Sequence, residues 1–160
     1  MIIKDYSTLE KLADLLRSKY TIGFTNGIFD LLHDGHVTLL KNAKKHCDVL
    51  IVAINSDTST RKIKGPKRPI LPEDIRTKIL DTIKYVDIVT VMQETDPTRL
   101  LEIIRPHVFF KGGEEYRDIS KYPEGDLLKK HGIKYVWINT PSTHTTDIIN
   151  EIVTRYGDAT

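Results

Sequence analysis

Residues 49–54 form the near-continuous apolar run Val-Leu-Ile-Val-Ala-Ile, which constrains the fold more than any other feature of the chain. A strand with apolar side chains on both faces has to be covered on both faces, and this is typical of a parallel strand. Shorter apolar runs, also predicted to be strands, occupy residues 21–25, 86–91, 108–110 and 135–138. The sequence therefore predicts a buried parallel sheet.

Segments with helical periodicity separate these strands. Helices are predicted at residues 7–19, from about Gly35, at residues 72–83, from Asp96-Pro97 to before Pro106, at residues 123–131, and from Thr145 or Thr146 onward. Ser7 is predicted to cap the first helix, with Glu10 completing a capping box. Alternating strands and helices joined by right-handed crossovers place helices on both faces of one sheet. We therefore expect a single Rossmann-like α/β domain over residues 1–160, with its ligand crevice at the carboxyl ends of the strands.

Composition excludes several classes of protein. The formal net charge is only +2 and the basic residues are scattered, which argues against a nucleic-acid-binding protein with a broad cationic face. No segment has the length and apolar content of a membrane span or signal peptide, so we expect a cytoplasmic protein. The lone Cys47 cannot form an internal disulfide and is interpreted as a small buried side chain.

Residues 61–72 form the segment of most unusual composition, because they combine five Lys and Arg residues with one glycine and three prolines. One interpretation is a solvated basic loop. The other is a mobile arm that closes over a polyanion, and its position after a strand's carboxyl end favours this second interpretation. Lys64 is expected to matter more than Lys67, because Lys64 precedes the glycine that allows the backbone to approach a ligand.

The segment from Phe24 to His36 carries the strongest functional signal. It predicts a buried strand, a glycine-containing loop and a helix that begins at Gly35-His36. A helix N-terminus binds phosphate well, and His33 and His36, on either side of the glycine, can each donate a hydrogen bond to a phosphate oxygen. Zinc binding is the rival interpretation. His46 and Cys47 lie about three turns further along the helix, so they cannot complete a zinc shell locally.

These motifs resemble the signature of the cytidylyltransferase-like nucleotidyltransferases. Within that superfamily, residues 20–155 are most similar to the heptose-1-phosphate adenylyltransferase domain, which occurs alone or fused to a sugar kinase. The matching stretches are Thr25-Asn26-Gly27-Ile28-Phe29-Asp30, His33-Asp34-Gly35-His36, residues 52–57, Lys64-Gly65, Arg68-Pro69-Ile70, Arg76, Val86-Asp87 and Lys111-Gly112-Gly113. Together they are far more specific than the histidine pair alone.

The resemblance implies roles for individual residues. His33, His36, Lys44 and Arg76 would be catalytic, through contacts with the phosphates. Asp30 and Lys44 would contact the acceptor, with Asp30 near the acceptor or the metal. The implied nucleotide-binding residues are Thr25, Asn26, Gly27, Phe29, Gly35, His36, Asn55, Asp57, Lys64, Lys111, Gly112, Gly113, Thr145 and Thr146. For Lys44 and Arg76 the alternative is a surface charge on a helix, and for Asp30 it is a cap or turn residue.

The last motif of the family, Ser-Thr-Thr at the start of the final helix, is altered in this chain. It reads His144-Thr145-Thr146, so that a histidine replaces the serine. Glycerol-phosphate cytidylyltransferases usually carry an arginine a few residues earlier, but residues 139–142 contain none, and Asn26 replaces an aromatic residue. These differences favour the heptose-type enzymes.

The implied reaction transfers AMP from ATP to a sugar 1-phosphate of the D-glycero-D-manno-heptose type and releases pyrophosphate. It needs no protein nucleophile, because a phosphate dianion predominates at neutral pH and can attack the α-phosphorus itself. Mg²⁺ is expected to bridge substrate phosphates, with no metal site of the protein's own. CTP-dependent transfer to glycerol 3-phosphate and a catalytically silent nucleotide-binding module are the alternatives. No nucleic acid or membrane partner is expected, and a homodimer is left open.

Overall fold

The computed structural model describes residues 1–157 and contains a parallel five-stranded sheet with the order β3-β2-β1-β4-β5. Every predicted strand is confirmed, with small shifts at its ends. The strands are β1 (Ile22–Gly27), β2 (Val49–Asn55), β3 (Ile88–Met92), β4 (Val108–Gly112) and β5 (Lys134–Ile138). The sheet is paired in parallel throughout, so all carboxyl ends lie along one edge.

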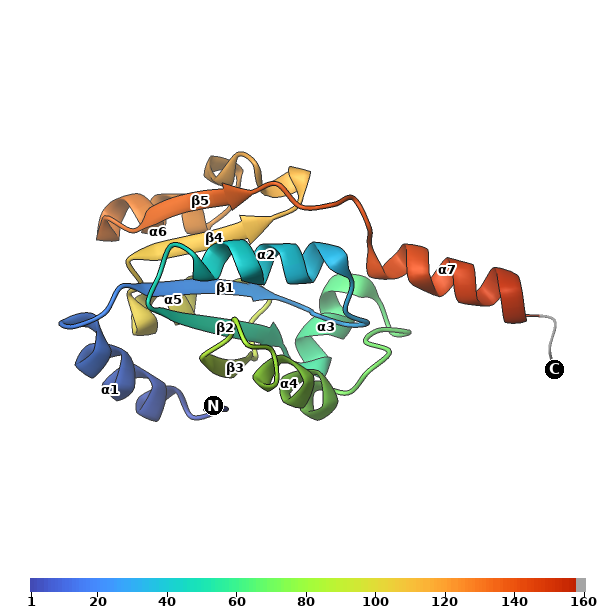
Figure 1. Ribbon diagram of the computed structural model, residues 1–160, viewed down its shortest axis with the longest axis horizontal. Helices are drawn as coiled ribbons and strands as arrows, with labels where there is room; N and C mark the ends of the chain where they lie inside the picture. The colour runs from blue at the N-terminus through green and yellow to red at the C-terminus, as the bar shows by residue number, and fades with distance from the viewer. Residues whose placement is uncertain (158–160) are drawn as a thin grey trace.

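Helices cover both faces of the sheet, as predicted (Figure 1). The helices α1 (Tyr6–Arg17), α5 (Thr98–Ile104) and α6 (Glu124–His131) pack on one face, and α2 (Asp34–Lys44) and α4 (Glu73–Asp81) pack on the other. The apolar run of β2 serves both layers. Ile51 and Ala53 belong to the core beneath α1 and α5, whereas Leu50, Val52 and Ile54 belong to the core beneath α2 and α4.

The remaining elements lie at or beyond the carboxyl edge of the sheet. Helix α3 (Asp57–Lys64) follows β2, and two short 3₁₀ helices (Glu114–Tyr116 and Ile119–Lys121) follow β4. Helix α7 (Thr145–Tyr156) leads away from the sheet, and Thr145 is the one buried residue within it (Figure 1). Within residues 1–157, the helices all fall short of the length and apolar content needed to span a membrane.

Two predicted helix starts were wrong. Helix α1 is capped by Asp5, whose carboxylate accepts a hydrogen bond from the Thr8 backbone at 2.7 Å, so Ser7 lies inside the helix. Helix α5 begins at Thr98, because the Asp96 carboxylate accepts from the Thr98 backbone at 3.0 Å and Pro97 precedes the first helical residue. In both cases an aspartate accepts a hydrogen bond from a free backbone N–H at the helix start.

The prediction of one basic loop over residues 61–72 was also wrong. Its first half, Arg61 to Lys64, is the last turn of α3. This helix is stabilised at its start by Ser56, whose hydroxyl accepts from the Ser59 backbone at 3.1 Å. It ends at Gly65, whose φ of 93° is a conformation that glycine adopts at little cost. The connection between α3 and α4 is therefore limited to residues 65–72.

That connection is fastened to the loop after β1 by Asp30. The Asp30 carboxylate accepts hydrogen bonds from Arg68 Nε at 2.8 Å, from the Ile70 backbone at 2.8 Å and from the Leu71 backbone at 3.0 Å. Burial alone would raise the pKa of Asp30, but these three donors outweigh burial and lower it. Asp30 therefore holds the basic connection in place as a carboxylate.

Candidate active site

A cavity of about 680 Å³ lies where the strand order reverses, between the carboxyl ends of β1 and β4. The chain passes from β1 to β2 on one side of this point and from β4 to β5 on the other. Parallel sheets bind ligands at such switch points. Asn26 and Gly27 of β1 and Lys111 and Gly112 of β4 line the cavity, and its volume suits a small-molecule ligand.

Two stacked histidines organise the first turn of α2 beside this cavity. The Gly35 backbone donates to His33 Nδ1 at 3.2 Å, and the His33 backbone donates to His36 Nδ1 at 3.4 Å. The centroids of the two rings are 3.8 Å apart. A Cβ on Gly35 would lie 3.0 Å from the His33 ring, so glycine allows this close packing.

Both imidazoles act as neutral hydrogen-bond donors when no polyanion is bound. Because Nδ1 is an acceptor in each ring, the ring proton lies on Nε2. Burial lowers the pKa of His33, and burial together with neighbouring His33 lowers the pKa of His36 to about 3. Each ring can therefore offer an Nε2–H to a phosphate oxygen, and the nearby negative charge would raise both pKa values.

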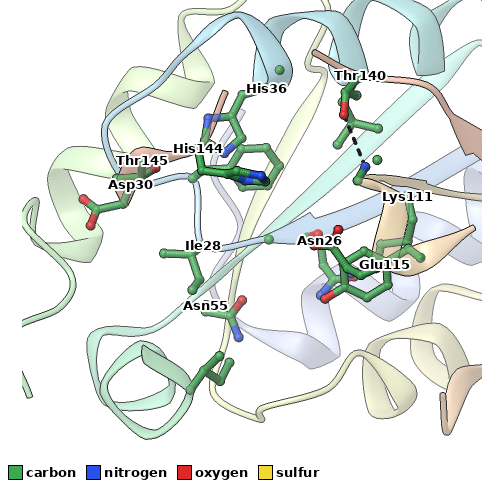
Figure 2. Close-up of a pocket in the computed structure, with 18 of the residues that line it drawn as sticks. Asn26, Ile28, Asp30, His36, Asn55, Lys111, Glu115, Thr140, His144 and Thr145 are labelled. Carbon is green, nitrogen blue, oxygen red and sulfur yellow. Dashed lines mark hydrogen bonds between the residues drawn. The ribbon is translucent and has the colours of Figure 1, made fainter. Parts of the chain in front are cut away.

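The N-terminus of α7 faces the same cavity as the N-terminus of α2. His144, Thr145 and Thr146 line the cavity together with the two histidines of α2. Figure 2 shows His36, His144, Thr145 and Asp30 gathered at one end of it. Two helix N-termini bring partial positive charge to one place, which favours a bound phosphate chain.

A buried lysine lies at the other end of the cavity, near Asn26 and Glu115 (Figure 2). Lys111 is 5% exposed, its Nζ donates to the Asn26 carbonyl at 3.3 Å, and it lies 4.5 Å from the centre of the Tyr116 ring. Burial lowers the pKa of Lys111 to about 8. Lys111 therefore remains mainly protonated at neutral pH and supplies a cation within the cavity.

The structure brings most of the predicted site residues to the cavity. Those that line it are Asn26, Gly27, Phe29, Asp30, His33, Gly35, His36, Asn55, Lys64, Lys111, Gly112, Gly113, Thr145 and Thr146. Lys67 does not line it. Their individual contacts with nucleotide and acceptor stay predictions.

Lys44 lies outside the cavity, at the opposite end of α2 from the histidines. It is about 12 Å along the helix axis from His36, given the rise of an α-helix. Its ammonium bonds to the Asp87 carboxylate and to the Asp48 carbonyl, each at 2.5 Å. The predicted contact with triphosphate or acceptor does not fit this position, because the side chain fastens α2 to the segment before β3.

Arg76 is placed behind the cavity rather than on it. Its side chain is fully buried, and the guanidinium donates to the carbonyls of Leu71, Ile28 and Asn55 and to the Asp57 carboxylate, at 2.7 to 2.8 Å. A donor so completely occupied has little left for the β/γ-phosphates. Asp57, its partner, likewise lies outside the cavity. Arg76 therefore joins the loop after β1, the end of β2 and the basic connection.

Thr25 is also separated from the cavity. It lies within β1 and is fully buried. Its hydroxyl oxygen has no hydrogen-bond partner among residues 1–157, and the side chain does not line the cavity.

Several cavity residues were missed in the sequence. They include Thr95, Asp96, Glu115, Tyr116, Tyr122, Glu124 and residues 139–143, together with Arg68, which was identified in the sequence only as part of a matching stretch. Residues 139–143 follow β5, so their position at a strand's carboxyl end was a usable signal. Glu124 had no such signal, because it lies at the start of α6, outside the matching motifs and not at the end of a strand.

Comparisons with known proteins show the family to which the chain belongs. The cytidylyltransferase-like family matches residues 24–155. The bifunctional protein HldE of Geobacter metallireducens is 38% identical over 159 residues, which cover 94% of this chain and 31% of that protein. This chain therefore spans about a third of the length of that relative.

Two solved structures share the fold. The lipopolysaccharide core biosynthesis protein from Thermoplasma volcanium is 27% identical with a TM-score of 0.64, over 78% of this chain and 99% of that chain. Pantoate-beta-alanine ligase from Francisella tularensis is 19% identical with a TM-score of 0.66, over 97% of this chain and 77% of that chain, and shows the fold alone. The family match, together with the histidine pair at the switch point of the sheet, identifies the chain as a nucleotidyltransferase of the cytidylyltransferase-like family.

Proposed function

We propose that this nucleotidyltransferase transfers AMP from ATP to a sugar 1-phosphate of the D-glycero-D-manno-heptose type, giving a nucleotide-activated sugar for carbohydrate metabolism. The observation that carries the proposal is the meeting of two helix N-termini and two neutral histidines on one cavity. The resemblance of the motifs to heptose-1-phosphate adenylyltransferase domains supports the choice of substrate, as does the similarity to a protein named HldE.

The chemistry follows from bringing two polyanions together. An oxygen of the acceptor phosphate attacks the α-phosphorus, a new P–O bond forms, and the bond to the departing pyrophosphate breaks. The acceptor needs no catalytic base, because its dianion predominates above a pKa of about 6. The Nε2–H groups of His33 and His36 donate to phosphate oxygens on which negative charge grows, and this oriented donation lowers the barrier.

Mg²⁺ fits this scheme as part of the nucleotide substrate. The Asp30 carboxylate, which lines the cavity at its histidine end, already accepts from Arg68, Ile70 and Leu71. Mg²⁺ is commonly held by phosphate oxygens and water with few protein ligands. We therefore assign its ligands mainly to the triphosphate.

The alternative is CTP-dependent transfer to glycerol 3-phosphate. The cavity segment 139–143 contains no arginine, although glycerol-phosphate cytidylyltransferases usually carry one there. This difference favours ATP and a sugar 1-phosphate.

A pyrophosphate-release screen tests the proposal. The four ribonucleoside triphosphates, each with Mg²⁺, are paired with sugar 1-phosphates and polyol phosphates. Release is expected to be fastest with ATP and a heptose 1-phosphate. Fastest release with CTP and glycerol 3-phosphate would establish the alternative, and no release with any pair would contradict the proposal.

A further inference from the structure

Glu124 is a buried carboxylate that the proposed phosphate chemistry does not use. It is the first residue of α6, is 3% exposed and lines the cavity. Its Oε2 atom is buried and has no hydrogen-bond partner among residues 1–157. An unsatisfied buried carboxylate oxygen is unfavourable, so its presence beside a cavity points to a ligand that supplies a hydrogen.

Asn26 presents a second acceptor of the same kind. It is 8% exposed, lines the cavity, and carries an Oδ1 atom that is buried without a partner among residues 1–157. Asn26 lies at the end of β1 and Glu124 at the start of α6, so two separate elements contribute these acceptors. Both acceptors need hydrogens that the described chain does not provide.

Lys111 adds donors beside these acceptors. Its ammonium has three hydrogens, and it donates a long hydrogen bond of 3.3 Å to the Asn26 carbonyl. Both residues line the same cavity, and the negative charge of Glu124 opposes the burial that lowers the pKa of Lys111. No ion pair within 4.0 Å joins them in residues 1–157. A ligand group that both accepts and donates can therefore fit between them.

Hydroxyl groups match this arrangement. A hydroxyl can accept from Lys111 while it donates to Glu124 or Asn26, and two adjacent hydroxyls can satisfy all three side chains at once. A phosphate fits poorly, because its dianion has no hydrogen to donate and is repelled by the Glu124 carboxylate. Tyr116 and Tyr122 also line the cavity, so that amphipathic aromatic side chains lie beside the three polar ones.

We propose that Asn26, Lys111 and Glu124 form a subsite that binds the hydroxyl groups of a substrate's sugar or polyol part. This inference rests on the proposed function, since both proposed substrates carry such hydroxyls: the ribose of the nucleotide and the ring of the acceptor sugar. Asn26 and Lys111 lie at the end of the cavity opposite His36 (Figure 2), and Glu124 lines the same cavity. Phosphate groups would bind at the histidine end, and substrate hydroxyls would bind at the subsite.

The test compares Glu124→Gln with a matched control, Asp126→Asn. Both changes remove one carboxylate charge from the first turn of α6, but Asp126 is exposed and does not line the cavity. Calorimetric titration with Mg²⁺ measures Kd for ATP against 2′-deoxy- and 3′-deoxy-ATP. A second arm, with α,β-methylene-ATP bound, measures Kd for sugar 1-phosphates against their monodeoxy analogues. Thermal unfolding confirms that each variant is folded.

In wild type, removal of the recognised hydroxyl is expected to weaken binding about 10-fold or more, the scale of a hydrogen bond to a charged group. In Glu124→Gln that difference should largely disappear, whereas Asp126→Asn should retain it. A change in the nucleotide arm assigns the subsite to ribose, and a change in the acceptor arm assigns it to the sugar. Unchanged discrimination in both arms, or an equal loss in Asp126→Asn, would overturn the inference.

The same design separates this inference from the proposed function. Both arms measure binding and need no turnover. If wild type releases no pyrophosphate with any acceptor while Glu124→Gln still loses discrimination between ATP and a deoxy-ATP, the proposed function fails and the subsite stands. If turnover is found and discrimination does not depend on Glu124, the subsite fails and the proposed function stands.

Discussion

The cavity wall and the network behind it use similar side chains in opposite ways. The cavity wall, here His33, His36, Lys64 and Lys111, faces the space where a ligand would bind. The support network consists of Arg76 and Asp57 behind the cavity and of Asp30, which also lines it. The side-chain groups of this network are bonded within the protein itself. In the wall the Nε2 atoms of both histidines have no hydrogen-bond partner within the described chain, whereas Arg76 makes bonds to three carbonyls and one carboxylate.

Because of this difference, the two groups of residues should affect different properties of the protein. A donor already bonded within the protein contributes to the shape of the site, and its loss leaves buried acceptors without partners. A donor without a partner remains available for a ligand, and its loss removes an interaction with that ligand. Mutations in the support network should therefore affect stability first, and mutations in the cavity wall should affect turnover first.

Arg76→Ala should have the largest effect on stability. It leaves the Leu71, Ile28 and Asn55 carbonyls without this donor and removes the partner of Asp57. The Arg76 side chain of this ion pair is fully buried and that of Asp57 is 27% exposed. Losing this pair together with the three carbonyl bonds should destabilise the protein by about 3–5 kcal/mol. Urea unfolding measures the effect, with Lys78→Ala, an exposed cation on the same helix, as control. A stable Arg76→Ala protein with selectively reduced turnover would place Arg76 on the phosphates instead.

His36→Ala should show the opposite pattern. Removing one oriented donor to the transition state lowers kcat about 100-fold or more. Stability should change much less than in Arg76→Ala. Steady-state kinetics and urea unfolding measure the two effects, and His46→Ala, an exposed histidine just beyond the other end of α2, is the control. Full turnover by His36→Ala would remove the histidine from the mechanism and erase the contrast between the two regions.

The pH dependence of stability should sharpen the comparison further. The pKa of His36 is lowered from 6.5 to about 3 in the folded protein, so below pH 6.5 the unfolded chain binds a proton that the folded chain does not. The free energy of unfolding should therefore fall as pH decreases from 6.5, with His36 contributing about 1 kcal/mol per pH unit. Urea unfolding between pH 7 and 5 measures this dependence, and the free energy of unfolding should change less steeply with pH in His36→Gln than in wild type. Equal slopes would mean that His36 is not held neutral.

Lys64→Ala is expected to give the smallest of these effects. Lys64 is exposed and lines the cavity, whereas Lys67 is exposed and does not. An exposed cation near a bound polyanion contributes about 1 kcal/mol or less, so kcat/KM should fall several-fold in Lys64→Ala and little in Lys67→Ala. Added salt should narrow the difference. Equal activity of the two variants at low salt would show that cavity position does not distinguish these lysines.

Sequence reasoning could predict the layers of the fold because they follow from local patterns. The run Val49–Ile54 required cover on two faces, and the structure divides its side chains between two cores. The errors in helix boundaries arose because several neighbouring residues could each have capped a helix. Asp5 caps α1 in place of Ser7, and Ser56 caps α3 in a segment for which no helix was predicted. These competing signals are visible in the sequence, but their relative strength is set by the backbone around them.

The histidine pair could also be predicted, because its spacing and neighbouring glycine define a local helix start. The position of Arg76 could not, since its burial depends on carbonyls contributed by three distant segments. Lys44 was predicted to reach the phosphates because helical spacing places it on the same side of α2 as His36. That spacing does not show which end of α2 lies at the cavity. Glu124 reaches the cavity through the packing of α6, for which the sequence carries no local signal.

The most direct test of the central claim is to follow the α-phosphorus of the nucleotide. ATP labelled at the α-phosphate, and separately at the γ-phosphate, is incubated with enzyme, Mg²⁺ and a heptose 1-phosphate. Nucleotidyl transfer predicts that α-label appears in a nucleotide sugar, that γ-label appears in pyrophosphate, and that His36→Ala suppresses both. Transfer of γ-label to the sugar, or α-label that remains in ATP, would contradict the account.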